Sequence, residues 1–376
     1  MARAYLDHAS SSPLRPAALD AMLPFLREHH ADPGRLHAEG RVTRVALEDA
    51  RAQVAAFFGA RPREVVFTAS GTESVNAALW GALRRAGKHS PHVVTTAVEH
   101  SCVRDALARS RAEVSSVGVS LLGRVDPDEL LDAVRDDTAL VSVQVANHEV
   151  GTRQPVAEIA AAARARGVLV HLDACAAAGH VPVDFGALDV DLCSVTAHKF
   201  GGPKGAGALL VRRGLRVDPL LVGGAQERAR RAGMEDVPAW VGFGAACAAC
   251  AVASEAAAQR ALVERAAHVV AAVPGVRRFG ASSADSSLPN VLCLGVDGVE
   301  AEPILLALDQ HGVAVHSGSS CSSETLEPSP VLAAMGVDAD RSLRVSVGWS
   351  SVGADVERFV EVFPGIVERL RGLRSA

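Results

Sequence analysis

Two residues at the ends of apolar segments have side chains that could take part in catalysis. Lys199 follows an apolar run in SVTAHKFGGPKG, and Asp173 closes the apolar run VLVHLDA. A lysine can lose its proton and attack a carbonyl group, which arginine does not do. Lys88, Lys199 and Lys204 are the only lysines among the 38 basic residues. This scarcity, with Thr196 and His198 beside it, favours a chemical role for Lys199 over that of an ordinary surface-loop lysine.

Asp173 would be costly to bury at the end of an apolar strand unless it meets a cationic partner. The protonated nitrogen of a pyridine ring is such a partner. A Schiff-base lysine combined with an aspartate on the ring nitrogen predicts a pyridoxal 5'-phosphate site. For Asp173 taken alone, capping of the next helix is an equally good explanation.

A phosphate group needs a binding site of its own, and the segment Ser70-Gly71-Thr72-Glu73 could supply one. It follows the apolar run EVVFTA, and Ser70 and Glu73 fit a capping box at a helix start. Free amide groups and the helix dipole attract an anion there. His100, in VEHS, could stack on a cofactor ring, although a single histidine is more often a polar residue at a strand end.

Cys321 lies in HSGSSCSSE, a segment of small polar residues with no sequence neighbour that is an obvious base. The Cys247-x-x-Cys250 pair lies in an alanine-rich helical run, and without a second ligand pair we interpret it as two core residues. No metal-binding pattern is predicted.

The elements that must position these residues alternate between helix and strand from about residue 44. Apolar strands are expected at 64–69, 92–98, 139–146, 168–174, 190–198 and 206–213, with helices at 46–59, 72–87, 126–134 and 155–167. Strands that are apolar throughout predict a mostly parallel α/β sheet covered on both faces. Such sheets bind ligands at the carboxyl ends of their strands, where Asp173 and Lys199 are expected.

After about residue 254 the pattern changes to a smaller α+β unit. Helices are expected at 254–273, 300–312 and 354–373, the last interrupted near Pro364, and strands at 290–296, 313–317 and 342–348. We expect a large domain over residues 14–253, and a small domain formed by residues 1–13 and 254–376 that carries Cys321.

The bulk composition excludes several classes of function. The net charge is -5 and no block of like charges stands out, so direct nucleic-acid binding is not expected. Neither a secretory signal nor a membrane-spanning run is apparent. The seven scattered cysteines suit reduced thiols. These features together predict a cytoplasmic protein.

The order of short segments along the chain resembles the cysteine desulfurases of the class V aminotransferase superfamily, which have fold type I, and in particular the group with a long cysteine loop. The similar segments are YLDHASSSP, LHAEGR, FTASGTES, VEHS, NHEVGTRQP, HLDA, AHKFGGPKG, GGAQER, SGSSCSS, LEPSPVL and SLRVSVG. The resemblance implies a seven-stranded sheet in the large domain. It also implies a homodimer, in which GGAQERARRAG reaches the partner's cofactor.

The resemblance implies a role for each matching residue. Lys199 would bind the cofactor covalently, Asp173 would pair with its ring nitrogen and His100 would stack on the ring. The phosphate would be held by Gly71, Thr72, Thr196 and His198. Arg344 would bind the carboxylate of the substrate, L-cysteine, and Cys321 would accept its sulfur and pass it to an acceptor protein that the sequence does not identify.

Three positions depart from the pattern of the family. Relatives usually have glutamine at the position of Ala176, asparagine at that of His148, and threonine at that of Met234. His148 would therefore add a titratable group where relatives contact cofactor or substrate. Two alternatives remain open at this point: a lyase or aminotransferase that acts on a modified amino acid with the same cofactor, and a weakly active paralogue that serves as a partner in sulfur relay.

Overall fold

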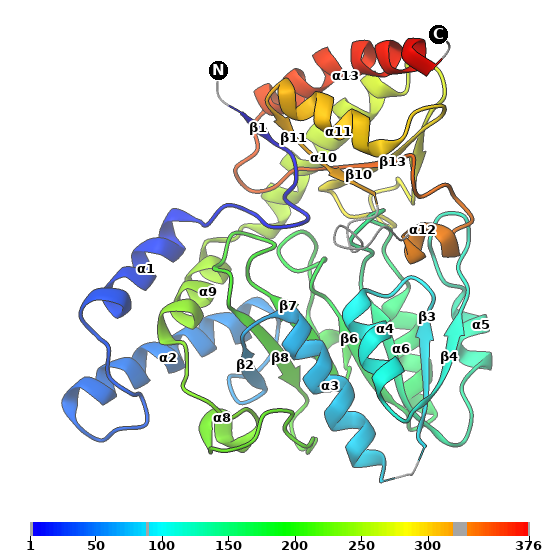
Figure 1. Cartoon of the computed structure of the whole chain (residues 1–376). Helices are drawn as coiled ribbons and strands as arrows, with labels where there is room; N and C mark the ends of the chain where they lie inside the picture. The colour runs from blue at the N-terminus through cyan, green and yellow to red at the C-terminus, as the bar shows by residue number, and fades with distance from the viewer. Residues whose placement is uncertain (1–2, 88–89, 319–328, 375–376) are drawn as a thin grey trace.

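The computed structural model describes residues 3–87, 90–318 and 329–374. Figure 1 shows two lobes, a larger one built around a central sheet and a smaller one that carries both the start and the end of the chain. The larger lobe holds most of the residues predicted to take part in chemistry.

A seven-stranded sheet in the order β2-β8-β7-β6-β5-β3-β4 forms the centre of the larger lobe. Its strands are β2 (Val65–Thr68), β3 (His92–Thr96), β4 (Glu113–Val117), β5 (Thr138–Gln144), β6 (Leu169–Asp173), β7 (Leu192–Thr196) and β8 (Gly207–Val211). β8 is antiparallel to both of its neighbours, and the other pairs are parallel. The predicted mostly parallel seven-stranded sheet is therefore confirmed.

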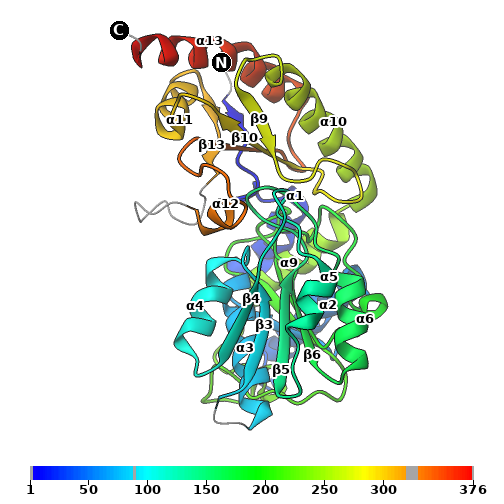
Figure 2. The same ribbon diagram turned by 90° about the vertical axis from the view of Figure 1, so that its right-hand side faces the viewer.

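Helices cover both faces of this sheet (Figure 2). One face packs against α3 (Gly71–Ala86) and α4 (Ser101–Arg109), and the other against α2 (Ala38–Phe57), α5 (Pro127–Asp132), α6 (Val156–Ala165) and α9 (Val237–Ala249). Neighbouring residues within a strand belong to different cores: Val65 and Phe67 face α2 and α9, whereas Val66 faces α3. Burial on both faces explains why these strands are apolar throughout rather than alternating.

Within the seven-stranded sheet, the edge strand β4 is the strand that the apolar pattern did not predict. Its residues, EVSSV, are exposed or half-buried along the whole strand. An edge strand that borders solvent needs no continuous apolar run, so its sequence looks like a loop. The helix α4 before it and the short α1 (Pro16–Arg27) were also absent from the sequence expectation.

The smaller lobe has an antiparallel sheet in the order β12-β13-β10-β9 and a two-stranded sheet of β1 and β11. These strands are β1 (Ala4–Tyr5), β9 (Val276–Phe279), β10 (Val291–Val296), β11 (Val313–Ala314), β12 (His316–Ser317) and β13 (Ser342–Ser346). Their covering helices are α10 (Val252–Val270), α11 (Ala301–Gln310) and α13 (Gly353–Arg374), with α12 (Pro330–Ala334) on the side of the larger lobe. The domain boundaries at 13/14 and 253/254 stay predictions.

The last helix differs from the expectation of an interruption near Pro364, because α13 continues through this proline. Proline removes one backbone hydrogen bond and usually kinks a helix. Here Phe359 and Phe363 before it and Ile366 and Val367 after it are all buried in one core with β10 and β13. Packing on both sides of the proline maintains the helix.

Among the described residues, no single helix combines the length and apolar composition of a membrane span, although the bent pair Val237–Ala249 and Val252–Val270 meets both criteria when counted together.

Candidate active site

The start of α3 forms the first part of the site. Ser70 is the N-cap, and its Oγ accepts a hydrogen bond from Glu73 N at 3.1 Å. This half of the predicted capping box is confirmed, but Glu73 Oε2 accepts from Ala69 N instead of closing the box on Ser70. The amide groups of Gly71 and Thr72 have no acceptor inside the helix, because they belong to its first turn. They are free to bind an anion.

Gly71 lies so close to two other strand ends that a side chain would not fit. A Cβ at Gly71 would come within 2.5 Å of Cys175 Sγ and 3.3 Å of Thr196 Cβ. Thr196 Oγ1 is 2.9 Å from His198 Nδ1. Burial, together with the charge of the neighbouring Lys199, lowers the pKa of His198 to about 4, so this imidazole is neutral near pH 7. Four predicted phosphate-binding residues therefore come from segments that meet at one point.

Asp173 is the last residue of β6 and is buried. Its Oδ1 accepts a hydrogen bond from Cys175 N at 2.9 Å, which fixes the carboxylate at the strand end beside the start of α3. Burial raises the pKa of Cys175 well above its ordinary value, and the charge of Asp173 adds to this. Cys175 is therefore a protonated thiol next to the site, and the sequence analysis did not single it out.

Lys199 lies three residues beyond β7, and its Nζ donates a hydrogen bond to Ala9 O. A small cavity of about 10 Å³ joins Lys199 to His148, Ala176 and Asn290. A much larger cavity, about 1010 Å³, opens between α3 and α4, and Thr72 and His100 are the predicted site residues on its wall. The site thus lies between a narrow cavity at the lysine and a wide groove on the surface.

His100 and His148 contact each other from two different turns. Their ring centroids are 4.9 Å apart in an edge-on arrangement. His100 is the N-cap of α4, and its Nδ1 accepts from Cys102 N at 3.1 Å, so its Nε2 carries the ring proton. His148 is buried, with its Nε2 at 3.4 Å from Glu149 Oε1. Within the described part of the chain, the side-chain hydrogen bonds of Asn147 go to backbone groups, and His148 lines the small cavity.

Arg344 reaches the site from β13 of the smaller lobe. Its guanidinium donates to His148 O at 3.0 Å, to Asp7 Oδ1 at 2.9 Å and to Ser10 Oγ at 2.7 Å. Its Nε is buried without a hydrogen-bond partner among the described residues. An unsatisfied buried donor on arginine is unusual, and a bound carboxylate would satisfy it.

Glu99 is a buried residue of the site that the sequence analysis missed. Its Oε1 accepts from Thr96 Oγ1 at 2.6 Å and from Gln144 N at 3.1 Å, while its Oε2 has no partner among the described residues. Burial raises its pKa to about 8, so the carboxyl is largely protonated at neutral pH. The one signal in the sequence was a charged residue directly before His100, at the end of an apolar strand.

Cys321 lies outside the described residues, so its position relative to Lys199 stays a prediction. Met234 is an exposed residue of the larger lobe. Cys247 is buried in the core, and the pKa values of both Cys247 and Cys250 are raised by burial, that of Cys250 to about 12. Two unreactive core thiols match the structural interpretation of this pair. Among the described residues, no group of three or more histidine, cysteine or acidic side chains could hold a metal ion.

The chain is similar over almost its whole length to one protein family and to known proteins. The model of the class V aminotransferase family matches residues 4–359. The chain is 39% identical to the cysteine desulfurase IscS of Methanosarcina thermophila, over 98% of this chain and 93% of that protein. It is 42% identical to the IscS-like cysteine desulfurase of Mycobacterium tuberculosis, over 98% of this chain and 97% of that protein.

Two solved structures have the same fold. A NifS-like protein superposes with a TM-score of 0.91 at 31% identity, over 98% of this chain and 100% of that one. A structure described as SspA in complex with cysteine gives a TM-score of 0.81 at 28% identity, over 93% of this chain and 99% of that one. The chain therefore belongs to the class V aminotransferase family and, within it, to the cysteine desulfurases.

Proposed function

We propose that this chain binds pyridoxal 5'-phosphate and uses it to remove sulfur from L-cysteine, with release of L-alanine and transfer of the sulfur to Cys321. The observation that carries the proposal is the convergence of an anion-binding helix start, a buried carboxylate, a lysine and an imidazole at the carboxyl ends of β3, β6 and β7. This is the set of groups that a phosphorylated pyridine aldehyde requires.

The residues present fit this cofactor. The amide groups of Gly71 and Thr72 supply donors for the phosphate, and the hydrogen-bonded pair of Thr196 and neutral His198 supplies one more. Asp173 supplies a buried carboxylate for the ring nitrogen. When bound, the cofactor withdraws electrons from the α-carbon of the amino acid. Ala176 has no hydrogen-bonding side chain, so the contact of the relatives' glutamine to the ring hydroxyl is lost here.

The remaining residues bind the substrate and move its protons. Arg344 offers its unsatisfied Nε to the carboxylate of L-cysteine, and His148 lies within the same region. The Nζ of Lys199 would take the α-proton of the substrate. His100 carries its ring proton on Nε2, from which it can donate a hydrogen bond or a proton to the substrate.

Cys321 receives the sulfur of the substrate as a persulfide, and an acceptor protein or small thiol then removes it. The chain leaves the described residues after β12, in which His316 pairs with Arg344. It returns at Ser329, whose Oγ donates to Glu149 Oε2 at 2.5 Å. Both ends of the segment that carries Cys321 thus lie beside the candidate site. A persulfide carrier needs a reducing compartment, so we place the protein in the cytoplasm.

We further propose that two copies of the chain form a homodimer. Apolar side chains are exposed at the groove between α3 and α4 and on the loop beside it: Trp80 at 44%, Leu221 at 41% and Val222 at 78%. Exposed apolar residues gathered in this way mark interaction sites.

The activity is tested by incubating the purified chain with L-cysteine and a dithiol reductant. We expect a yellow protein that releases alanine and sulfide in equal amounts. Borohydride reduction and peptide mapping should place the cofactor on Lys199 and not on Lys88 or Lys204. Ammonia and pyruvate in place of alanine would instead indicate a lyase.

A further inference from the structure

Four consecutive backbone carbonyl groups around Lys199 are held by two residues from the start of the chain. The bonds are Ser12 N to His198 O at 2.8 Å, Ser12 Oγ to Lys199 O at 2.9 Å, Arg15 Nε to Phe200 O at 2.8 Å and Arg15 N to Gly201 O at 2.8 Å. Paired carbonyl groups fix the backbone of this turn. Residues 12–15 therefore form a clamp on the lysine turn, residues 198–201.

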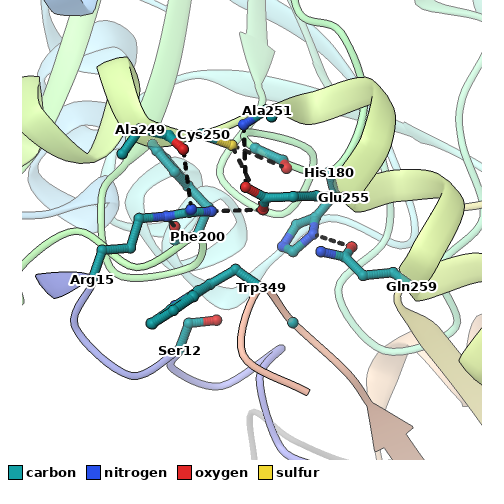
Figure 3. A network of polar contacts seen from close by, with 12 residues as sticks. Ser12, Arg15, His180, Phe200, Ala249, Cys250, Ala251, Glu255, Gln259 and Trp349 are labelled. Carbon is teal, nitrogen blue, oxygen red and sulfur yellow. Dashed lines mark hydrogen bonds and ion pairs between the residues drawn. The ribbon is translucent and has the colours of Figure 1, made fainter. Parts of the chain in front are cut away.

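The side chain of Arg15 is itself fixed by the junction between α9 and α10 (Figure 3). Its Nη2 lies 2.6 Å from Glu255 Oε2, and its Nη1 donates to Ala249 O at 3.3 Å. Glu255 Oε1 in turn accepts from Ala251 N at 3.1 Å. Arg15 is only 6% exposed, so this ion pair is largely removed from water and holds the guanidinium in one orientation.

The clamp also contacts the smaller lobe. Trp349, just after β13, donates from Nε1 to Pro13 O at 2.8 Å, and Arg15 lies over its ring at 5.2 Å. Gly201 has a φ of +93°, and a Cβ there would come within 2.6 Å of Arg15 Cγ and 2.7 Å of Trp349 Nε1. Gly201 of the lysine turn therefore packs directly against both Arg15 and Trp349.

His180 supports the same turn from the opposite side. Its Nε2 lies 3.3 Å from both Lys199 O and the amide of Asn290, and its Nδ1 lies 2.9 Å from the amide of Gln259. Burial lowers the pKa of His180, which keeps the ring neutral. Gln259 Nε2 and Asn290 Oδ1 have no hydrogen-bond partner among the described residues. When the oxygen and nitrogen of each amide group are exchanged, Gln259 Nε2 donates to His180 Nδ1, and His180 Nε2–H donates to Asn290 Oδ1 and to Lys199 O.

We propose that Ser12 and Arg15 are positioning residues for Lys199, and that Glu255 and Trp349 couple the position of this lysine to the arrangement of the two lobes. The proposal rests on the proposed function, in which the Nζ of Lys199 is the reacting amine. A misplacement of a reacting group by about 1 Å can cost on the order of 100-fold in rate. The clamp does not contact substrate, so its loss should act on the chemical step rather than on binding.

The first test compares Ser12→Ala with Ser11→Ala. The side chain of Ser11 makes no hydrogen bond in the part of the chain that the structure describes, so it is a matched control. We expect Ser12→Ala to lower kcat by about fivefold with an unchanged KM for L-cysteine, and Ser11→Ala to match the parent. Equal kcat values for Ser12→Ala and the parent, or a change confined to KM, would overturn the proposal.

The second test compares Arg15→Lys with Arg212→Lys. Lysine keeps the charge opposite Glu255 but has a methylene group in place of Nε, so the bond from that position to Phe200 O is lost. Arg212 forms an ion pair with Asp191, which directly precedes β7 at the end of the strand away from Lys199. Arg212→Lys therefore serves as the control. We expect a fall in kcat of about 10- to 100-fold for Arg15→Lys and none for Arg212→Lys. Equal effects of the two substitutions would mean that Arg15→Lys acts only through a general loss of stability, which would contradict the proposal.

A third measurement does not depend on activity. The full-length chain without cofactor is labelled with a trace amount of acetic anhydride, and acetylation of Lys199 is measured against exposed Lys204 in the same molecules. Ser12→Ala should change the Lys199 to Lys204 ratio at least twofold, and Ser11→Ala should not. An unchanged ratio would overturn the clamp. Absence of sulfide production by the parent would instead overturn the proposed function and leave this readout valid.

Discussion

The histidines near the candidate site differ in what surrounds them. His8 and His171 are buried and His198 is half-buried, each against a hydroxyl group, and desolvation lowers the pKa of each to about 4. His100 and His148 instead contact each other beside the cavities. His8, His171 and His198 therefore serve as neutral hydrogen-bonding residues near pH 7.

His148 gives a prediction at this scale, because relatives usually have asparagine there. The charged and titratable groups around it are Glu149 at 3.4 Å, His100, Lys199, Arg344 and buried Glu99. Arg344, the residue proposed to bind the carboxylate of L-cysteine, donates to the backbone of His148. We therefore expect the side chain at position 148 to influence the KM for L-cysteine.

The variant His148→Asn should change the KM for L-cysteine by roughly two- to tenfold, the range of one hydrogen bond, while the cofactor linkage to Lys199 stays intact. Steady-state kinetics provide the measurement, and His268→Asn on the exposed face of α10 is the control. A KM that is the same for His148→Asn and the parent would exclude the role.

Glu99 gives a prediction about stability and pH in the cofactor-free chain. Its pKa rises from 4.5 to about 8 on folding, so the folded state keeps a proton that the unfolded state releases. Stability should therefore fall as pH rises from about 4.5 to 8, by up to about 1.4 kcal/mol per pH unit. His8, His171 and His198 act in the opposite direction, but only below their ordinary pKa of 6.5.

Between pH 6.5 and 8, the change of the free energy of unfolding with pH therefore tests Glu99 separately from these three histidines. Urea unfolding at both pH values should show a loss of stability in the parent and a smaller loss in Glu99→Gln. Parallel behaviour of the two proteins would show that Glu99 is not the group responsible.

At the scale of elements, the sequence predicted the buried strands and the polar residues that follow them. Asp173 and Lys199 were placed at strand ends from the apolar runs before them, and α3 from its Ser70 cap. The exposed edge strand β4 carried no such pattern. The clamp of Ser12 and Arg15 was not predictable because it joins residues almost 190 positions apart through backbone carbonyl groups, which leave no pattern in side-chain types.

A buried ion pair gives the prediction at this scale. Arg51 of α2 binds both carboxylate oxygens of Glu227 at 2.6 Å, and Glu227 also accepts from Phe67 N at 2.8 Å. Glu227 begins three consecutive non-glycine residues with positive φ, which is a strained backbone conformation. This pair holds the strained loop against α2 and β2.

Arg51→Met should lower the free energy of unfolding by about 3–5 kcal/mol, because it leaves a buried carboxylate without its partner. The double variant Arg51→Met with Glu227→Gln removes the charge as well and should be more stable than the single variant. Urea denaturation followed by circular dichroism measures both. A loss below about 1 kcal/mol in the single variant would contradict this account of the loop.

At the scale of the whole molecule, the site is assembled from both lobes. Lys199 and Asp173 come from the larger lobe, whereas Arg344 comes from β13 of the smaller one and donates to His148 O across the boundary. Ser329 bonds Glu149 of the larger lobe, and the ring of Trp349 contacts Arg15. A change in lobe arrangement should therefore alter both Arg344, the arginine proposed to bind the substrate, and the lysine turn.

The proposed homodimer is tested at this scale. Light scattering at micromolar concentration should give twice the chain mass of 39.0 kDa. Trp80→Glu, in the groove between α3 and α4, should produce a monomer, because a charge cannot be buried there without a partner. Leu306→Glu, on the exposed face of α11, should remain dimeric. A fully active parent that is monomeric would contradict the dimer.

The central claim is that sulfur passes from L-cysteine to Cys321. The direct measurement is peptide mapping by mass spectrometry after the holoenzyme is incubated with L-cysteine, without reductant, and its thiols are alkylated. The account predicts one additional sulfur on Cys321, none after incubation with L-alanine, and none in Lys199→Ala. Formation of alanine with an unmodified Cys321, or additional sulfur only on another of the seven cysteines, would contradict it.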